Sequence, residues 1–413
     1  MDPAPRHAKT GRAKISPRPP RVSLSLLRIA VTTLALMWAL PVSAQQVCPP
    51  RALPPINTCA NTQRISIAIV GDVLLHRALQ WRGYARGFDT IWGAAAPLLS
   101  GADLAIANLE GPVAAGFTAT GQRVADPGPT LDDNVYTGYP RFNYHRVVID
   151  ELRTAGVDIV TTANNHALDR GSRGLDATLD ALDAARLHHT GAVRGGTSRF
   201  TPLRIRSRVG PLSLIACTFG TNGLADPHQQ VPRCYDDRAE LLHLVAAEAA
   251  RGAGVIVLPH WGQEYSLQPD RQQRRLGHDL AMAGAMAVVG THPHVPQPWE
   301  MRAAGGGIVP IIYSTGNFVA AQPRLERATS FMAWLNVCAG PRGPHVAGAG
   351  YIPLQMEFEG ADLSLTLPRP GMDPRAEAGH ALLARLIPGY DLTATTECQR
   401  TRRPATLPFA EDR

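Results

Sequence analysis

Polar side chains that can bind metal ions follow several short apolar runs in this sequence. They supply carboxylate, carboxamide and imidazole groups, a mixture suited to Mn, Fe or Zn, whereas a calcium site would be almost entirely oxygen. One or two divalent ions bound by them would activate water for hydrolysis. The candidate residues, in chain order, are Asp72, His76, Asn108, Glu110, Asn164, Asn165, His166, His260, His292, His294 and Asn317.

Each of these motifs is weak evidence on its own. An Asn-Asn-His sequence such as 164–166 is usually a turn, and an aspartate after glycine, such as Asp72, usually caps a helix. The pair His292 and His294 is stronger, because alternate residues of an extended segment point the same way. Several such clusters after successive apolar runs are hard to attribute to capping, since burying so many polar groups without a ligand would be costly.

The apolar runs predict the strands that must position these groups. They do not alternate with polar residues, as expected of strands buried on both faces. The predicted strands are 65–70, 104–107, 157–162, 212–216, 255–258, 285–289 and 309–313. Segment 203–209 predicts a hairpin partner for 212–216, and strand-like segments 352–358 and 363–367 suggest a second sheet layer.

Helical patterns separate several of the predicted strands. They cover 144–155, 175–187, 238–251 and 272–283, and glycine follows three of them as a stop signal. Repetition of strand and helix predicts an α/β fold, in which ligands bind beyond the carboxyl ends of the strands. The long Gly- and Pro-rich loop 112–140 directly after one strand end is typical of a functional loop.

The start of the chain predicts export. The first 28 residues carry seven Arg and Lys against Asp2, and 29–40 contains no charge. This order is typical of a signal peptide, with cleavage after Ala44. The uncharged run is shorter than the ~20 residues that span a bilayer. An uncleaved N-terminal membrane anchor is the alternative, and in either case the rest of the chain is periplasmic or extracellular.

Composition after residue 44 excludes several functions. Both lysines, Lys9 and Lys14, lie in the predicted signal, whose removal lowers the formal net charge from +7 to about +1. We therefore expect no nucleic-acid partner and no lysine-based catalysis. Six cysteines remain, none in a Cys-x-x-Cys motif, so disulfides are favoured over a thiolate zinc site. We predict pairing between sequence neighbours, namely Cys48–Cys59, Cys217–Cys234 and Cys338–Cys398.

Four segments follow from these patterns. Residues 1–44 are the signal peptide, and 45–63 form an N-terminal segment that contains cysteines. Residues 64–370 form a single main domain, and 371–413 form a C-terminal tail rich in Pro and Ala.

The ordered motifs resemble those of the CapA family of bacterial capsule and poly-γ-glutamate proteins. The resemblance covers Ile65 to Val319 and includes Glu264 and Tyr265, four and five residues after His260. It rests on the segments Gly71 to Arg77, Asn108 to Gly111, Ala163 to Gly171, His260 to Tyr265, His292 to Gln297 and Tyr313 to Phe318.

The resemblance implies a calcineurin-like metallophosphoesterase fold, a two-layer β-sandwich flanked by helices, with metal ions at the strand ends. It implies that His166 is the catalytic imidazole and that Glu110 bridges two ions. The implied metal ligands are Asp72, Glu110, Asn165, His260, His292 and His294. Additional candidates are His76, Asn108, Asn164, Glu264, Tyr265 and Asn317, of which Glu264 and Tyr265 would orient substrate.

Two departures from the family pattern leave the number of ions open. Leu74 stands where phosphoesterases have a first-strand histidine, and Thr291 stands where many relatives have another histidine. His166 favours a hydrolase of a phosphorylated or γ-glutamyl envelope substrate, because a site that only binds needs no general acid. The missing first-strand histidine favours a non-catalytic component that assembles with membrane-bound polymer synthesis proteins. A structural protein without metal is a third interpretation.

Overall fold

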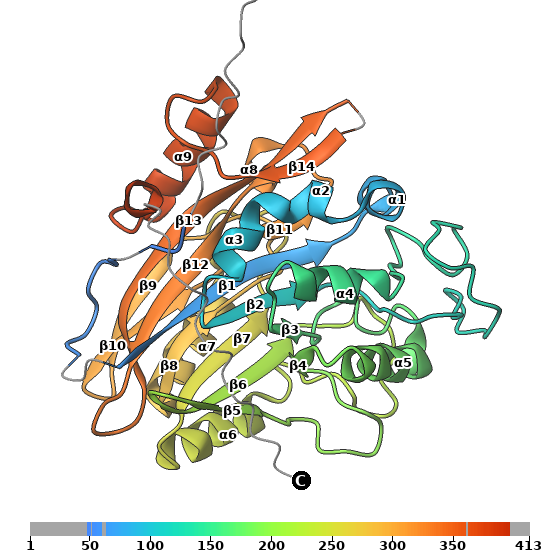
Figure 1. The fold of residues 1–413 in the computed structure, drawn as a ribbon. Coiled ribbons are helices and arrows are strands. Elements are labelled where there is room, and N and C mark those ends of the chain that lie inside the picture. Colours follow the sequence, from blue (N-terminus) through green and yellow to red (C-terminus); the bar gives the residue numbers. More distant parts are fainter. Residues whose placement is uncertain (1–47, 51, 60–62, 361, 397–413) are drawn as a thin grey trace, which may run out of the picture. The chain divides into compact units, whose positions relative to one another are not determined.

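The computed structural model describes residues 48–50, 52–59, 63–360 and 362–396, so the predicted signal peptide lies outside the described residues. The described residues belong to one compact unit. Two sheets pack face to face, and helices cover both outer faces (Figure 1). The two-layer β-sandwich flanked by helices, in a single main domain, is therefore confirmed. Among the described residues, none of the helices has the length and apolar character that crossing a membrane requires.

The first sheet has a parallel half and an antiparallel half that meet at its central strand, β1. The parallel half contains β1 (Arg64–Leu74), β2 (Leu104–Leu109), β3 (Ile159–Thr161), β4 (His188–Thr190) and the short β11 (Asn317–Ala320). The antiparallel half contains β12 (Thr329–Cys338), β13 (His345–Glu359) and β14 (Asp362–Thr366).

The second sheet runs in the order β5-β6-β7-β8-β10-β9. Its strands are β5 (Leu203–Ser207), β6 (Gly210–Thr218), β7 (Gly254–His260), β8 (Ala285–Val289), β9 (Trp299–Ala304) and β10 (Gly307–Ile312). Strands β6, β7, β8 and β10 are parallel, so their carboxyl ends lie at one edge of the sheet. The predicted hairpin between 203–209 and 212–216 is confirmed as the antiparallel pair β5 and β6.

Side chains on alternate positions of β1 belong to two different cores. Ile65, Ile67 and Ile69 pack between the sheets, whereas Ala68 and Val70 pack under the helices of the first sheet. Because each buried isoleucine stabilises the fold by about 1.5–3 kcal/mol, a strand buried on both faces is favoured over one with a polar face. This explains why the predicted strands read as unbroken apolar runs.

The helices form the outer layers. The first sheet is covered by α1 (Arg77–Arg86), α2 (Asp89–Trp92), α3 (Ala96–Leu99), α4 (Val147–Thr154) and α5 (Gly171–Ala184), with a 3-10 turn at Gly93–Ala95. The second sheet is covered by α6 (Arg238–Ala250) and α7 (Arg271–Ala283). The four predicted helices correspond to α4, α5, α6 and α7 with shifted ends. Gly284 ends α7 in the left-handed conformation, at φ 111°.

The segments 352–358 and 363–367 do not build the second layer, so that prediction is wrong. They lie in β13 and β14, which extend the first sheet. The cause is β12, which pairs antiparallel with β1. β13 then pairs antiparallel with β12, and β14 with β13, so all three strands join the first sheet. The second layer comes instead from 203–312.

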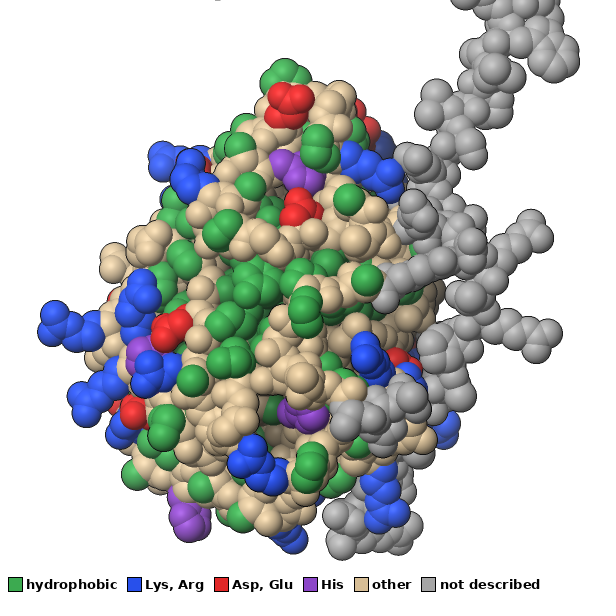
Figure 2. Space-filling view, turned by 90° about the vertical axis from the view of Figure 1, so that its left-hand side faces the viewer, with side chains coloured by type: hydrophobic (Ala, Val, Ile, Leu, Met, Phe, Trp, Pro, Cys, Tyr) green, Lys and Arg blue, Asp and Glu red, His purple; other side chains and the backbone are tan. Residues whose placement is uncertain are grey.

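Residues at both ends of the described chain pack onto the sheets. In the predicted N-terminal segment, Asn57 Nδ2 donates to the carbonyls of Ile308 and Val346 at 2.8 and 2.7 Å. The predicted C-terminal tail contains α9 (Pro374–Leu386) and a 3-10 turn (Thr393–Thr395), and Leu383 of α9 is fully buried between the sheets. Figure 2 shows the face that carries β9 and β10, where hydrophobic side chains gather near the middle and arginines lie mostly toward the margin.

The disulfides only partly follow sequence proximity. The predicted bond Cys217–Cys234 is confirmed. The second described bond joins Cys59 to Cys338, so the predicted pairs Cys48–Cys59 and Cys338–Cys398 are wrong. The register of β12 on β1 places Cys338 opposite Arg64, next to the N-terminal segment, and therefore brings together two cysteines 279 residues apart.

Candidate metal centre

The candidate centre lies beyond the carboxyl ends of parallel strands from both sheets. Asp72 is in β1, Glu110 follows β2, and His260 ends β7, while His292 and His294 occupy the loop after β8. All five side chains are at most 3% exposed. The two sheets bring these ends together because their parallel strands point toward the same end of the sandwich (Figure 1).

Ligand atoms of these residues form three overlapping groups. In each group, one donor atom from every residue lies within 4.8 Å of the others. Glu110, His292 and His294 each belong to two of the groups, and of these three only the carboxylate has two oxygens with which to contact two ions. The groups are Asp72, Glu110 and His294; Glu110, His260 and His292; and Glu264, His292 and His294.

The Glu110 carboxylate is buried without a hydrogen-bond donor. Neither of its oxygens has a partner among the described residues, and the same holds for Nδ1 of His292. The nearest imidazole nitrogens, Nε2 of His260 and Nε2 of His294, are 3.5 and 3.9 Å from Oε1. A buried carboxylate costs several kcal/mol unless it is paired or binds a metal, so these residues fit a divalent ion.

The ionisation of the centre is strongly perturbed. Burial works to raise the pKa of Glu110, but His294 and His260 together lower it below its ordinary value. Burial works to lower the pKa of His294, but Glu110 and Asp72 raise it to about 9. Burial also lowers the pKa of His292 well below its ordinary value. Opposed shifts of this kind in one cluster are typical of functional sites.

Two asparagines hold the candidate ligands in place. Asn108 Nδ2 donates to Asp72 Oδ1 at 2.7 Å, and its Oδ1 accepts from Thr161 Oγ1 at 2.9 Å. Asn317 Oδ1 lies 2.9 Å from His294 Nδ1. Both carboxamides are therefore engaged in orienting neighbours.

The loop after β3 adds a second pair of asparagines to the centre. Asn165 Oδ1 lies 2.8 Å from Nε2 of His260, so these two candidate ligands meet. Asn164 Nδ2 donates to the carbonyl of Leu109 at 2.8 Å, and its Oδ1 accepts from the backbone N–H of His166 at 3.2 Å. Asn164 thus fixes the loop that presents Asn165 and His166.

His166 is held by a carboxylate and lies outside the ligand groups of the described residues. Its Nδ1 is 2.8 Å from Asp169 Oδ2, which also accepts from the backbone N–H of Phe142 at 2.7 Å. Burial works to lower the pKa of His166, but Asp169 raises it above its ordinary value. Asp169 thus engages Nδ1, whereas the other ring nitrogen, Nε2, lies 3.5 Å from Asn222 Nδ2.

The backbone around the centre is held in unusual conformations. His292 and His294 have φ of 96° and 57°, a region that bulky residues rarely adopt and that is commonly found at functional sites. A Cβ on Gly71 would lie 1.7 Å from the carbonyl oxygen of Gly316. Only glycine therefore allows β1 to approach the loop before β11 this closely.

The two departures from the family pattern have structural consequences. Leu74 is buried in the core under the helices. His76 does not replace the missing histidine within the described ligand groups. Its Nδ1 lies 3.2 Å from the carbonyl oxygen of Leu74 and 3.3 Å from the backbone nitrogen of Ala321. Thr291 Oγ1 lies 2.9 Å from Nδ1 of His260 and holds that ring.

The loop 112–140 is fastened beside the centre by a buried arginine. Arg170, 1% exposed, donates through Nε to the carbonyl of Phe117 at 3.0 Å and through Nη2 to the carbonyl of Val135 at 3.0 Å and Thr137 Oγ1 at 2.7 Å. Arg170 directly follows Asp169. The segment that orients His166 is thus also the segment that holds the loop.

Three residues near the centre were not identified from the sequence. Asp169 stands three residues after His166, a spacing that allows the pair to meet in a turn, and this signal was available. Phe219, whose ring centroid is 4.2 Å from that of His292, and Asn222, whose Oδ1 accepts from Asn165 Nδ2 at 3.1 Å, follow β6. They reach the centre only through the packing of the two sheets.

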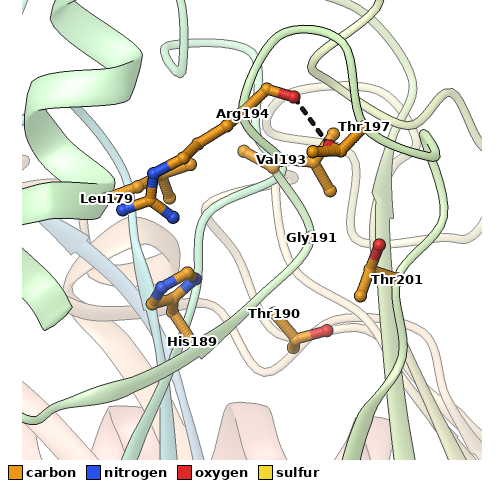
Figure 3. A pocket seen from close by; sticks show the side chains of 9 residues that line it. Leu179, His189, Thr190, Gly191, Val193, Arg194, Thr197 and Thr201 are labelled. Atoms are coloured by element: carbon orange, nitrogen blue, oxygen red, sulfur yellow. Dashed lines mark hydrogen bonds between the residues drawn. The ribbon is translucent and has the colours of Figure 1, made fainter. Parts of the chain in front are cut away.

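A separate pocket of 210 Å³ lies next to β4 (Figure 3). Its charged lining residue Arg194 is paired with Asp180 and Asp183 at 2.8 and 2.6 Å. His189 also contacts Asp183, at 3.1 Å. The positive charge at this pocket is therefore already neutralised within the chain.

Fold and centre together define a two-sheet α/β protein with a buried carboxylate and histidine cluster at its strand ends. The family model described as "Bacterial capsule synthesis protein PGA_cap" matches residues 66–322, which include the whole candidate centre. The chain belongs to this family, and the resemblance seen in the sequence is confirmed.

Two relatives carry related descriptions. "PGA biosynthesis protein CapA" of Bacillus subtilis (strain 168) is 27% identical over 62% of this chain and 64% of its own length. The match thus spans slightly less than two thirds of that relative. "Capsule biosynthesis protein CapA" of Bacillus anthracis is 26% identical over 74% of this chain and 69% of its own length.

Among solved structures, a calcineurin-like phosphoesterase from Bacillus subtilis is similar with a TM-score of 0.36 and 14% identity. The match covers 81% of this chain and 97% of that one.

Proposed function

We propose that this chain is an exported metal-dependent hydrolase that acts in the biosynthesis of a capsule, poly-γ-glutamate or a related envelope polymer. The observation that carries the proposal is the Glu110 carboxylate, which is buried, belongs to two candidate ligand groups and has no hydrogen bond to either oxygen within the described residues. Membership of the capsule synthesis family supports the polymer, and the two described disulfides support export.

The residues fall into three roles in this proposal. Divalent ions, one or two of Mn, Fe or Zn, would be held by Asp72, Glu110, Asn165, His260, His292 and His294. Such ions would supply charge neutralisation at the scissile group and a water of lowered pKa. His166 would donate a proton from Nε2 to the leaving oxygen or nitrogen, while Asp169 keeps the ring in place. Asn108, Asn317 and Thr291 would keep the ligands in position.

The substrate in this proposal is a phosphoester or a γ-glutamyl amide of an envelope polymer. Both bonds develop negative charge on an oxygen during attack by water, which is the charge that a cationic centre stabilises. Membrane-bound polymer synthesis proteins are the proposed partners.

The test measures metal content and hydrolysis on the same preparation. Protein expressed without residues 1–44 is loaded with Mn or Zn, passed through gel filtration and analysed for bound metal. It is then assayed with p-nitrophenyl phosphate esters and with γ-linked glutamate oligomers. Glu110→Gln should retain less metal and lose turnover. A metal-loaded wild type that hydrolyses neither substrate class would refute the hydrolase.

One observation favours a second function. The first-strand histidine of phosphoesterases is replaced by the buried Leu74, and His76 does not take its place in the described ligand groups. With that ligand absent, the centre would hold one ion rather than two and would lose the two-ion activation of water and substrate. The second candidate is therefore a non-catalytic metal-containing component that assembles with polymer synthesis or export proteins, and it predicts bound metal without hydrolysis.

A further inference from the structure

An arginine that makes no ion pair within the described residues lies beside the candidate centre. Arg327 is in the short helix α8 (Leu325–Ala328), and its side chain is half-buried. Its guanidinium carbon is 3.4 Å from the centroid of the Tyr265 ring, a cation–π contact. The Tyr265 side chain is itself exposed, at 40% of its surface. Arginine and tyrosine thus form one flat platform that solvent can reach.

This platform is tied to the centre by two hydrogen bonds. The backbone N–H of Tyr265 donates to the carbonyl of Pro293, between the two candidate ligands of that loop, at 2.7 Å. Asn317 Nδ2 donates to the carbonyl of Arg327 at 3.0 Å, while Oδ1 of the same asparagine lies 2.9 Å from His294 Nδ1. The Tyr265 and His294 ring centroids are 6.1 Å apart. These hydrogen bonds keep the Arg327 and Tyr265 side chains at a fixed distance from the candidate ligands.

The backbone of Tyr265 has an unusual conformation. Its φ is 66°, a left-handed conformation that is costly for a bulky side chain and persists only where the surroundings impose it. The conformation places the ring under the Arg327 guanidinium.

Arg327 differs in this respect from Arg194 and Arg204, whose charges are neutralised by carboxylates. Arg194, which lines the pocket beside β4 (Figure 3), is paired with Asp180 and Asp183. Arg204 is paired with Glu248 at 2.8 Å. The donors of Arg327 remain available to a ligand, and a guanidinium fork binds the two oxygens of a carboxylate or phosphate side by side.

We propose that Arg327, held flat by Tyr265, binds an oxyanion of the substrate next to the bond that the centre acts on. Cleavage of the neighbouring bond rests on the proposed function, whereas binding of the anion by Arg327 does not. In a γ-linked glutamate chain each residue carries a free α-carboxylate beside its amide, and in a phosphorylated polymer the neighbouring phosphate plays this part. Arg327 thus determines the class of substrate, one that carries a negative charge close to the scissile bond.

Equilibrium binding tests the proposal without relying on turnover. Isothermal titration at moderate salt measures the affinity of metal-free and metal-loaded protein for two probes, a γ-linked glutamate oligomer and inorganic phosphate. Arg327→Gln should weaken the binding of the preferred probe about tenfold or more, as expected for a lost charge-assisted hydrogen bond. Arg327→Lys keeps the charge but not the fork and should bind with intermediate affinity.

A matched control lies three residues away. Arg324 is exposed and directly precedes α8, so Arg324→Gln removes the same charge from the same segment without touching Tyr265. It should bind both probes within about twofold of wild type at moderate salt, where distant charges are screened. Tyr265→Leu supplies a second variant, which removes the platform while leaving Arg327 and should also weaken binding.

The outcomes separate this inference from the proposed function. Equal affinities of wild type and Arg327→Gln for both probes would overturn it, and so would wild-type protein that binds neither probe with or without metal. Loss of glutamate binding alone identifies a carboxylate, and loss of phosphate binding alone identifies a phosphate. If binding depends on Arg327 but the protein shows no turnover, the result supports anion binding by Arg327 and refutes only the proposed hydrolase activity.

Discussion

His166 and His260 both follow a strand end, yet their contacts predict different losses on substitution. His260 Nε2 lies 2.8 Å from Asn165 Oδ1 and 3.5 Å from Glu110 Oε1, among the candidate ligands. His166 Nδ1 is held by Asp169, outside those groups. His260→Ala should therefore lose metal, whereas His166→Ala should retain it and lose about 10²–10⁴-fold in rate.

The expected size of the difference follows from linkage between binding and stability. An ion present at 100 times its dissociation constant stabilises the folded protein by about 2.7 kcal/mol. If His260→Ala weakens affinity 100-fold, the same ion concentration stabilises that variant by only about 0.4 kcal/mol. Unfolding curves with and without metal should therefore separate by a few degrees in wild type and His166→Ala, and hardly at all in His260→Ala.

The assay combines these unfolding curves with the metal content after gel filtration and the rate on one phosphoester. His243→Ala is the matched control, because this histidine is exposed on α6, away from the strand ends. Equal metal loss in His166→Ala and His260→Ala would make His166 a ligand and remove the proposed proton donor.

Three further outcomes are expected. Asp169→Asn should keep its metal-induced stabilisation but lower the rate at least about tenfold, because His166 loses its orienting carboxylate; an unchanged rate would refute the pairing. The hydrogen bond with Asp391 raises the pKa of His380, and the pKa of Asp391 is lowered. Asp391→Asn should therefore lower the free energy of unfolding most between about pH 4 and 6.5, by less than about 1 kcal/mol, and the difference should shrink as pH rises through the folded-state pKa of His380. A difference that grows above pH 7 in urea unfolding would contradict this. Thiol titration of the denatured, unreduced protein should find few free thiols among the six cysteines, and six reactive thiols in protein isolated from its native compartment would make them ordinary core residues.

The position of the centre was predictable because buried parallel strands end at a common edge. That rule alone placed Asp72, Glu110, His260, His292 and His294 together, although they span more than 200 residues. It depends only on the apolar runs and on the polar residues that follow them.

Features that depend on strand order were not predictable in the same way. The Cys59–Cys338 bond follows from the register of β12 on β1, and nothing local in the sequence encodes that pairing. Phe219 and Asn222 reach the centre only because one sheet packs on the other. Asp169, by contrast, could have been predicted as the partner of His166, because the two residues are three positions apart and can meet in a turn.

The pairing of β1 with β12 also determines the order in which the protein can fold. β1 supplies Asp72, but one of its neighbours, β12, begins at Thr329, some 255 residues later in the chain. Until that strand emerges, the growing chain carries Ile65, Ile67 and Ile69 on a strand with an open edge, a template for pairing with other chains. Contacts between segments so far apart form slowly. We therefore expect the sheet around the centre to be completed late, with the edge of β1 open to other chains until β12 is synthesised.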